Sequence, residues 1–211
     1  MRSLLGGIAA AAVAVVLLNA PALAQQTIVE EWPTIQPPPA PALKPVTVDP
    51  KTTALLVLDF VKQTCNMERR PRCIASLPVA KQLLAAARAS NVFVVYSLIP
   101  NSSMGDVLPE VAPSGNEPYV QATIDKFFKT DLEKILKDRG IETIIVTGTA
   151  AHGAVMYTGS EAVVRGFKVI VPVDAVSADN AFIEQYVAYN FTSAPSVAGA
   201  STLTRASMIK F

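Results

Sequence analysis

The sequence predicts an α/β fold in which helices cover both faces of a mainly parallel sheet. Short apolar runs alternate along the chain with stretches in which apolar residues recur at helical spacing. Alternation of this kind implies right-handed crossovers between parallel strands. The run TALLVLDF at 53–60 is apolar almost throughout, as expected for a strand that is buried on both faces.

Each expected helix begins and ends at residues typical of such positions. Ser76 and Pro78 begin the helix after the first strand, and Asn91 ends it. Thr130 caps the next helix, and Gly140 closes it. The proline-containing stretch 100–124 predicts a long loop of the kind that often covers a site. The expected strands are 53–60, 92–99, 142–147, 168–173 and 201–204, and the expected helices are 76–90, 131–139, 151–165 and 180–191.

The amino-terminal fifty residues divide into two segments that precede a single domain. Residues 1–24 combine a basic start, an apolar run and an Ala-Leu-Ala end, which is typical of a secretory signal peptide. An uncleaved membrane anchor is the alternative. Residues 25–50 contain seven prolines and predict an extended arm or linker. We therefore expect a periplasmic or secreted protein, free of the membrane after cleavage, with one domain at 51–211.

Charge and composition do not point to a nucleic-acid partner or to a metal site. The formal net charge is +1, the chain has one histidine, and no basic stripe suggests nucleic acid. The local cluster Arg69-Arg70-Arg72 is interpreted as a solvated loop in preference to an anion site. We predict no metal and no cofactor.

The two cysteines, Cys65 and Cys73, predict a disulfide, because paired cysteines in an exported protein usually join. The alternative makes one of them a catalytic thiol. Neither cysteine lies at a strand-to-helix turn, so the disulfide is favoured.

Four segments together resemble the isochorismatase-like, or cysteine hydrolase, superfamily. They are TALLVLDF at 53–60, FFKTDLEKIL at 127–136, GIETIIVTGTAAHGAV at 140–155 and RGFKVIVPVDAVSA at 165–178. The resemblance implies a three-layer α/β/α sandwich with a mainly parallel, Rossmann-like sheet, and a homo-oligomer. It also implies hydrolysis of small amides, carbamoyl groups or ureides, or cleavage of the vinyl ether of isochorismate in a smaller branch.

The resemblance also assigns three catalytic positions, of which one matches clearly. The family's aspartate corresponds to Asp59. Its lysine falls at Gln121 when residues are counted back from the FFxT segment, whereas Lys126 lies five residues later and is the remaining candidate cation. Its cysteine falls at Ala154, by natural divergence or by engineering. A thiolate mechanism is therefore excluded, since residue 154 carries no nucleophile.

Acid–base chemistry remains available. Desolvation at a strand end is expected to raise the pKa of Asp59, so that its carboxyl can donate a proton; a carboxylate that caps backbone is the alternative. Backbone amides near Gly153 and Ala154, in the turn that contains Thr149 and Ala150, are a candidate oxyanion hole or a plain strand-to-helix turn.

His152 could bind a ligand or act as a base, or else it is a surface histidine. Two hypotheses follow. The first is an exported hydrolase that uses Asp59 without a covalent cysteine. The second is an inactive relative that binds a small molecule or a protein partner in the former pocket.

Overall fold

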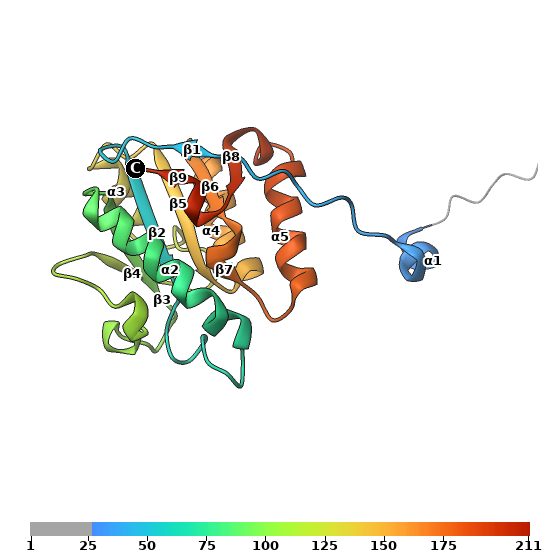
Figure 1. Ribbon diagram of the computed structural model, residues 1–211, viewed down its shortest axis with the longest axis horizontal. Coiled ribbons are helices and arrows are strands. Elements are labelled where there is room, and N and C mark those ends of the chain that lie inside the picture. Colours follow the sequence, from blue (N-terminus) through green and yellow to red (C-terminus); the bar gives the residue numbers. More distant parts are fainter. Residues whose placement is uncertain (1–26) are drawn as a thin grey trace, which may run out of the picture. The chain divides into compact units, whose positions relative to one another are not determined.

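The main sheet of the computed structural model is parallel throughout, which confirms the predicted fold class (Figure 1). Its strand order is β4-β3-β2-β5-β6-β8, and the short β7 pairs with the end of β5. The structure describes residues 27–211, so the predicted signal peptide at 1–24 lies outside the described residues. The strands are β2 Thr53–Leu58, β3 Phe93–Leu98, β4 Tyr119–Gln121, β5 Thr143–Thr149, β6 Lys168–Pro172, β7 Val176–Ser177 and β8 Ser201–Thr204.

Alternate residues of the central strands point to opposite faces of the sheet. Both faces are apolar, and helices cover each of them. Leu55 and Val57 of β2 belong to one apolar cluster, together with residues of α2. Leu56 and Leu58 belong to the other, together with residues of α3, α4 and α5. These helices are α2 Pro71–Ala89, α3 Leu132–Lys137, α4 Met156–Val164 and α5 Ala181–Ser193.

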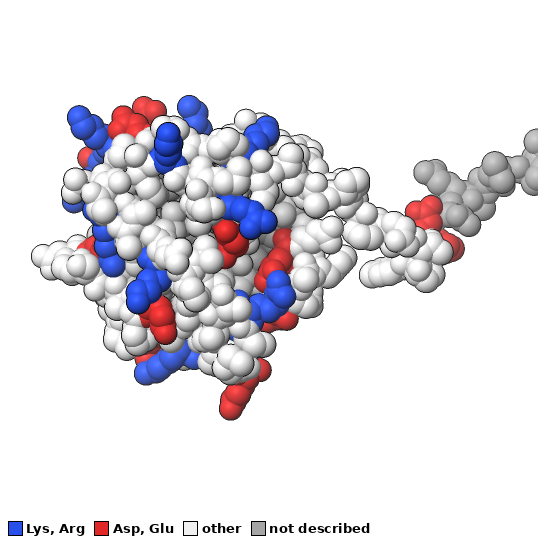
Figure 2. Space-filling model, in the orientation of Figure 1, with Lys and Arg blue, Asp and Glu red and all other residues white. Residues whose placement is uncertain are grey.

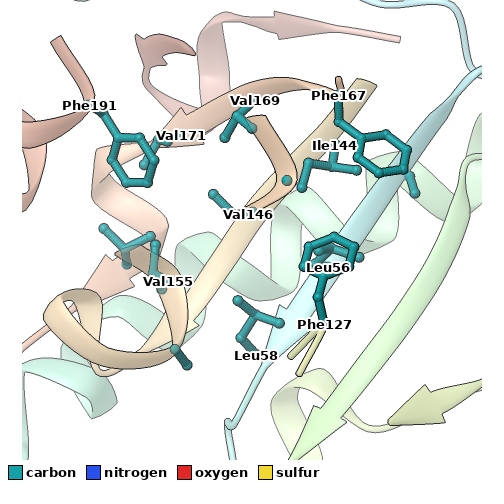
Figure 3. Packing of buried hydrophobic residues seen from close by; sticks show 14 of the residues in the cluster. Leu56, Leu58, Phe127, Ile144, Val146, Val155, Phe167, Val169, Val171 and Phe191 are labelled. Carbon is teal, nitrogen blue, oxygen red and sulfur yellow. The ribbon is translucent and has the colours of Figure 1, made fainter. Parts of the chain in front are cut away.

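The second cluster is the larger of the two and runs along β2 and β5. Figure 3 shows side chains from three neighbouring strands meeting Phe127, Val155, Phe167 and Phe191. The rings of Phe127 and Phe167 stack with their centroids 6.1 Å apart. This packing fixes the segment around Phe127 against the sheet. Lys126 directly precedes Phe127, so its backbone is held there as well.

The amino-terminal region differs in part from the expected extended arm. Residues 27–38 are a separate unit with one helical turn, α1 Ile28–Glu31, which Thr27 and Glu30 close in a capping box. Residues 39–211 form the second unit. Its short strand β1, Val46–Thr47, pairs in parallel with β9, Ile209–Lys210. Two-residue strands carry no periodicity, so the sequence did not indicate them.

Helix α2 begins at Pro71 and not at the expected Ser76. Proline at the first position suits a helix start because it has no N–H to satisfy there. Ser76 lies inside the helix, where its hydroxyl donates to the carbonyl of Cys73 at 2.8 Å. The expected helix from 151 likewise opens differently, with a π-helical turn over Ala151–Val155.

The predicted disulfide between Cys65 and Cys73 is present, and both residues are buried. Because the chain has only these two cysteines, neither is a free catalytic thiol. The bond closes the segment that joins β2 to α2.

Charged side chains of both signs are interspersed on the face of the molecule drawn in Figure 2. The distribution agrees with the small formal net charge of +1. None of the helices formed by residues 27–211 combines the length and the apolar character that a membrane crossing requires.

Gly148 allows the carboxyl ends of β2 and β5 to approach closely. It pairs with Leu58 across the two strands and has a φ of 135°, a backbone conformation that side chains disfavour. A Cβ atom at this position would lie 2.2 Å from the carbonyl oxygen of Leu58. Glycine is therefore required at residue 148, which pairs with Leu58, the residue directly before Asp59.

We predict that Gly148→Ala lowers the free energy of unfolding by about 3 kcal/mol or more, because overlap with backbone cannot be relieved by a side-chain movement. Denaturant unfolding measures the change. Gly105→Ala is the matched control, since its Cβ would meet only the Ser103 hydroxyl at an ordinary 3.6 Å. Equal stability of the two variants would contradict the proposed close approach.

Candidate functional site

Asp59 lies at the carboxyl end of β2 with its side chain directed into the protein. Its φ of 55° turns the chain sharply after the strand, a conformation that aspartate tolerates better than most residues. The residue is 3% exposed. The Ser97 hydroxyl donates to Asp59 Oδ1 at 2.7 Å, and Lys126 Nζ lies 2.7 Å from Asp59 Oδ2. Side chains therefore bind both carboxylate oxygens, and the alternative in which Asp59 caps backbone is wrong.

Lys126 is fully buried and forms an ion pair with Asp59. Its ammonium group also donates to the carbonyls of Ala122 at 2.9 Å and Thr123 at 2.6 Å. Its backbone N–H donates to the Thr158 hydroxyl at 3.2 Å. A buried ammonium is tolerated only when its charge is paired and its donors are satisfied, and both conditions hold here.

Residue counting aligns Gln121 with the family lysine, but the structure places Lys126 beside Asp59. Gln121 is exposed on β4, and its amide nitrogen donates to the carbonyls of Ile99 and Ser102. The positive charge beside Asp59 is therefore retained, on Lys126. The chain turns back between the two positions, so that the carbonyls of Ala122 and Thr123 face the Lys126 ammonium. A count of residues could not detect that turn.

Burial dominates the electrostatics of this pair. Desolvation raises the pKa of Asp59 above its ordinary value, and the charge of Lys126 opposes that rise. Desolvation likewise lowers the pKa of Lys126, and the charge of Asp59 opposes the fall. The direction expected from the sequence for the Asp59 pKa is the direction found. Both shifts move the pKa values of the two groups toward neutral pH, where a proton transfer group is most useful.

The strand-to-helix turn after β5 lies at the same edge of the sheet. The Thr149–Ala150 peptide is cis, and Ala154 is buried in the π-helical turn that follows. The Gly153 N–H donates to the Ala150 carbonyl at 3.0 Å, so this amide is already used within the turn. Of the two amides expected to polarise a carbonyl, only that of Ala154 remains a candidate.

His152 is half-buried in the same turn. Its Nδ1 atom is buried, and no hydrogen-bond partner for it occurs among residues 27–211. Over the same range, no group of three acidic, histidine or cysteine side chains gathers as metal ligands would.

Arg70 is the site residue that sequence reasoning missed. The solvated-loop interpretation of the arginine cluster holds for exposed Arg69 but is wrong for Arg70, which is 6% exposed. Its guanidinium donates to Asp179, to the Thr64 carbonyl and to the Thr149 hydroxyl. Two of these partners lie 79 and 109 residues away in the chain, so no local pattern could have indicated them.

With this geometry established, comparison with known proteins identifies the family. The family model for the isochorismatase domain matches residues 53–198. The chain belongs to the isochorismatase family. The matched range contains Asp59, Lys126, Ala154 and Arg70, so the whole candidate site lies inside the family domain.

Individual relatives are distant. N-carbamoylsarcosine amidase of an Arthrobacter species is 28% identical over 99 residues, covering 44% of this chain and 38% of the amidase. The chain thus spans well under two thirds of that relative. A secreted isochorismatase effector of Verticillium dahliae is 26% identical over 144 residues, covering 63% of this chain and 76% of the effector.

Among solved structures, an isochorismatase-like hydrolase from Alkaliphilus metalliredigens superimposes with a TM-score of 0.67 at 21% identity. The superposition covers 74% of this chain and 95% of that one. This likeness shows the fold alone. The family match, by contrast, makes the chain hydrolase-like.

We predict that Asp59→Asn and Lys126→Met each lower the free energy of unfolding by about 3–5 kcal/mol near neutral pH, because each leaves its partner as an unpaired buried charge. The double variant is expected to lose less than the sum of the two, since no lone charge remains. Denaturant unfolding of the four proteins gives the coupling energy. Strictly additive losses would contradict a buried ion pair.

Lys134→Met serves as the control. It removes an exposed lysine that pairs with Asp138 on the surface of α3. Exposed pairs contribute little to stability, so this variant should unfold almost as the parent does.

Proposed function

We propose that the chain is an exported isochorismatase-family hydrolase that acts on a small molecule through acid–base chemistry at Asp59, with no covalent step at residue 154. One observation carries the proposal: the buried Asp59–Lys126 pair is retained, whereas the nucleophile position holds alanine. An acid with a raised pKa and a fixed orientation is the group that proton transfer requires.

The proposed reaction balances without an enzyme-bound intermediate. Protonated Asp59 donates its proton to the leaving atom of a small amide or ester, or to a vinyl-ether carbon. Water supplies a hydroxyl group to the substrate, and its remaining proton returns to Asp59. Lys126 and Ser97 orient the carboxyl and stabilise the carboxylate that forms between these steps.

Three features support export. Residues 1–24 have the pattern of a signal peptide. The Cys65–Cys73 disulfide suits an oxidising compartment. One relative is a secreted isochorismatase effector of Verticillium dahliae.

A second function is favoured by a different observation. Both Asp59 oxygens and the Lys126 ammonium already have protein partners, which suits a resting structural pair as well as a catalytic one. In that case the domain binds a small molecule or a protein partner without converting it.

We predict turnover in a panel of small amides, esters and vinyl ethers, with kcat/KM about 10²- to 10⁴-fold lower in Asp59→Asn. Iodoacetamide should leave the activity unchanged, because the protein has no free thiol. Asp138→Asn, which alters a surface carboxylate directly after α3, is the matched control. Activity that Asp59→Asn retains would overturn the proposal. A panel compound that raises the melting temperature without being converted would favour the binding protein.

We predict that activity falls as pH rises through the pKa of Asp59, because the protonated carboxyl is the reactive form. That pKa lies above the ordinary value of 3.8. Lys126 lowers the Asp59 pKa, so Lys126→Met should move the midpoint of the pH–rate profile to higher pH. Lys129→Met, at an exposed lysine nearby, should leave it in place. A midpoint that moves to lower pH in Lys126→Met would contradict the assignment.

A further inference from the structure

A single buried guanidinium connects the two strand ends that form the candidate site. Arg70 Nη1 donates to the Thr64 carbonyl at 3.3 Å and to the Thr149 hydroxyl at 3.2 Å. Its Nε donates to Asp179 Oδ1 at 3.0 Å, which also neutralises its charge. The planar, forked guanidinium can hold several acceptors in fixed directions at once, which an ammonium group cannot.

Two of these partners lead directly to the site. On one side, the Thr64 hydroxyl donates to the backbone carbonyl of Asp59 at 2.6 Å. On the other, Thr149 is the last residue of β5, and its hydroxyl donates to the Ser177 carbonyl at 3.2 Å. The turn that contains Ala154 begins just after Thr149. Arg70 therefore joins the strand end that carries Asp59 to the strand end that leads to Ala154.

The backbone of Arg70 is itself held in place. Its N–H donates to the Asn66 carbonyl at 2.9 Å, and its carbonyl accepts from the Cys73 N–H at 2.9 Å. The Cys65–Cys73 disulfide closes the same segment, and α2 begins at the next residue. Because the backbone of Arg70 is held in place, its guanidinium can keep Thr64 and Thr149 at a fixed separation.

We propose that Arg70 is a positioning residue, which fixes the turn around Ala154 relative to Asp59. The inference rests on the proposed function for what the site does, but its test measures the geometry of the site alone. Arg72, two residues away, provides the contrast: it pairs with Glu184 at the surface and makes no bond to Thr64 or Thr149.

The reporter is a thiol introduced by Ala154→Cys into the full chain. Residue 154 lies in the first turn of the helical segment that begins at Ala151, where backbone N–H groups favour a thiolate and lower the thiol pKa. The native cysteines are paired and do not titrate. Thiolate absorbance, measured as a difference from the parent protein across pH, gives the pKa of the introduced thiol.

We predict that adding Arg70→Met raises that thiol pKa by about one unit, because a loosened turn no longer holds the sulfur in place at the amino-terminal end of the helical segment. Arg70→Lys should shift it equally, since it keeps the charge and loses the fork. Arg72→Met should leave it unchanged. An unchanged pKa in a folded Arg70→Met protein, or full restoration by Arg70→Lys, would overturn the proposal.

Thr149→Val provides a second, milder test if Arg70→Met does not fold. It removes only the hydroxyl that Arg70 contacts and preserves the shape of the side chain, so it should raise the thiol pKa in the same direction. No shift would overturn the proposal. Because these readouts need no substrate, a shifted thiol pKa in a protein without turnover supports the role of Arg70 and rejects only the proposed hydrolysis.

Discussion

The buried ion pair between Asp59 and Lys126 is the interaction on which the candidate site depends. Neither charge could remain in the interior alone, because removing an ion from water costs far more than one hydrogen bond returns. Asp59 accepts a hydrogen bond from Ser97 and pairs with Lys126, and the Lys126 ammonium also donates to two loop carbonyls. The pair thus ties the end of β2 to the segment before Phe127, which the apolar cluster fixes against the sheet. The same two residues therefore form the candidate acid–base pair and connect β2 to the packed core.

A parallel sheet brings its functional side chains together because all of its carboxyl ends lie at one edge. Here β2 and β5 are adjacent, and Gly148 lets them approach so closely that no other residue fits. Arg70 then links the segments beyond those two strands. The site therefore has a rigid frame even though alanine occupies the position of the family's nucleophile. Such a frame suits proton transfer, which depends on fixed geometry and a shifted pKa more than on a covalent bond.

Much of the fold could be predicted because its determinants are local. Apolar runs, helical spacing and capping residues indicated the strands and helices of the domain, and Asp59 followed from its place at a strand end. The errors arose where local signals compete or vanish. Pro71, at the start of α2, outweighed the capping signal at Ser76, and two-residue strands such as β1 and β9 have no periodicity to detect.

By itself, the sequence determined the α/β class, the disulfide, the acid at residue 59 and the absence of a nucleophile at residue 154. Only the tertiary structure decided that Lys126 places a positive charge beside Asp59, whereas the neutral Gln121 bonds to the carbonyls of Ile99 and Ser102. It also decided that Arg70 is buried, through partners as far as 109 residues away. Residue type and local periodicity can be read directly from the sequence, because they depend only on neighbouring residues. The pairing of buried charges depends on which distant segments the folded chain brings within hydrogen-bond distance.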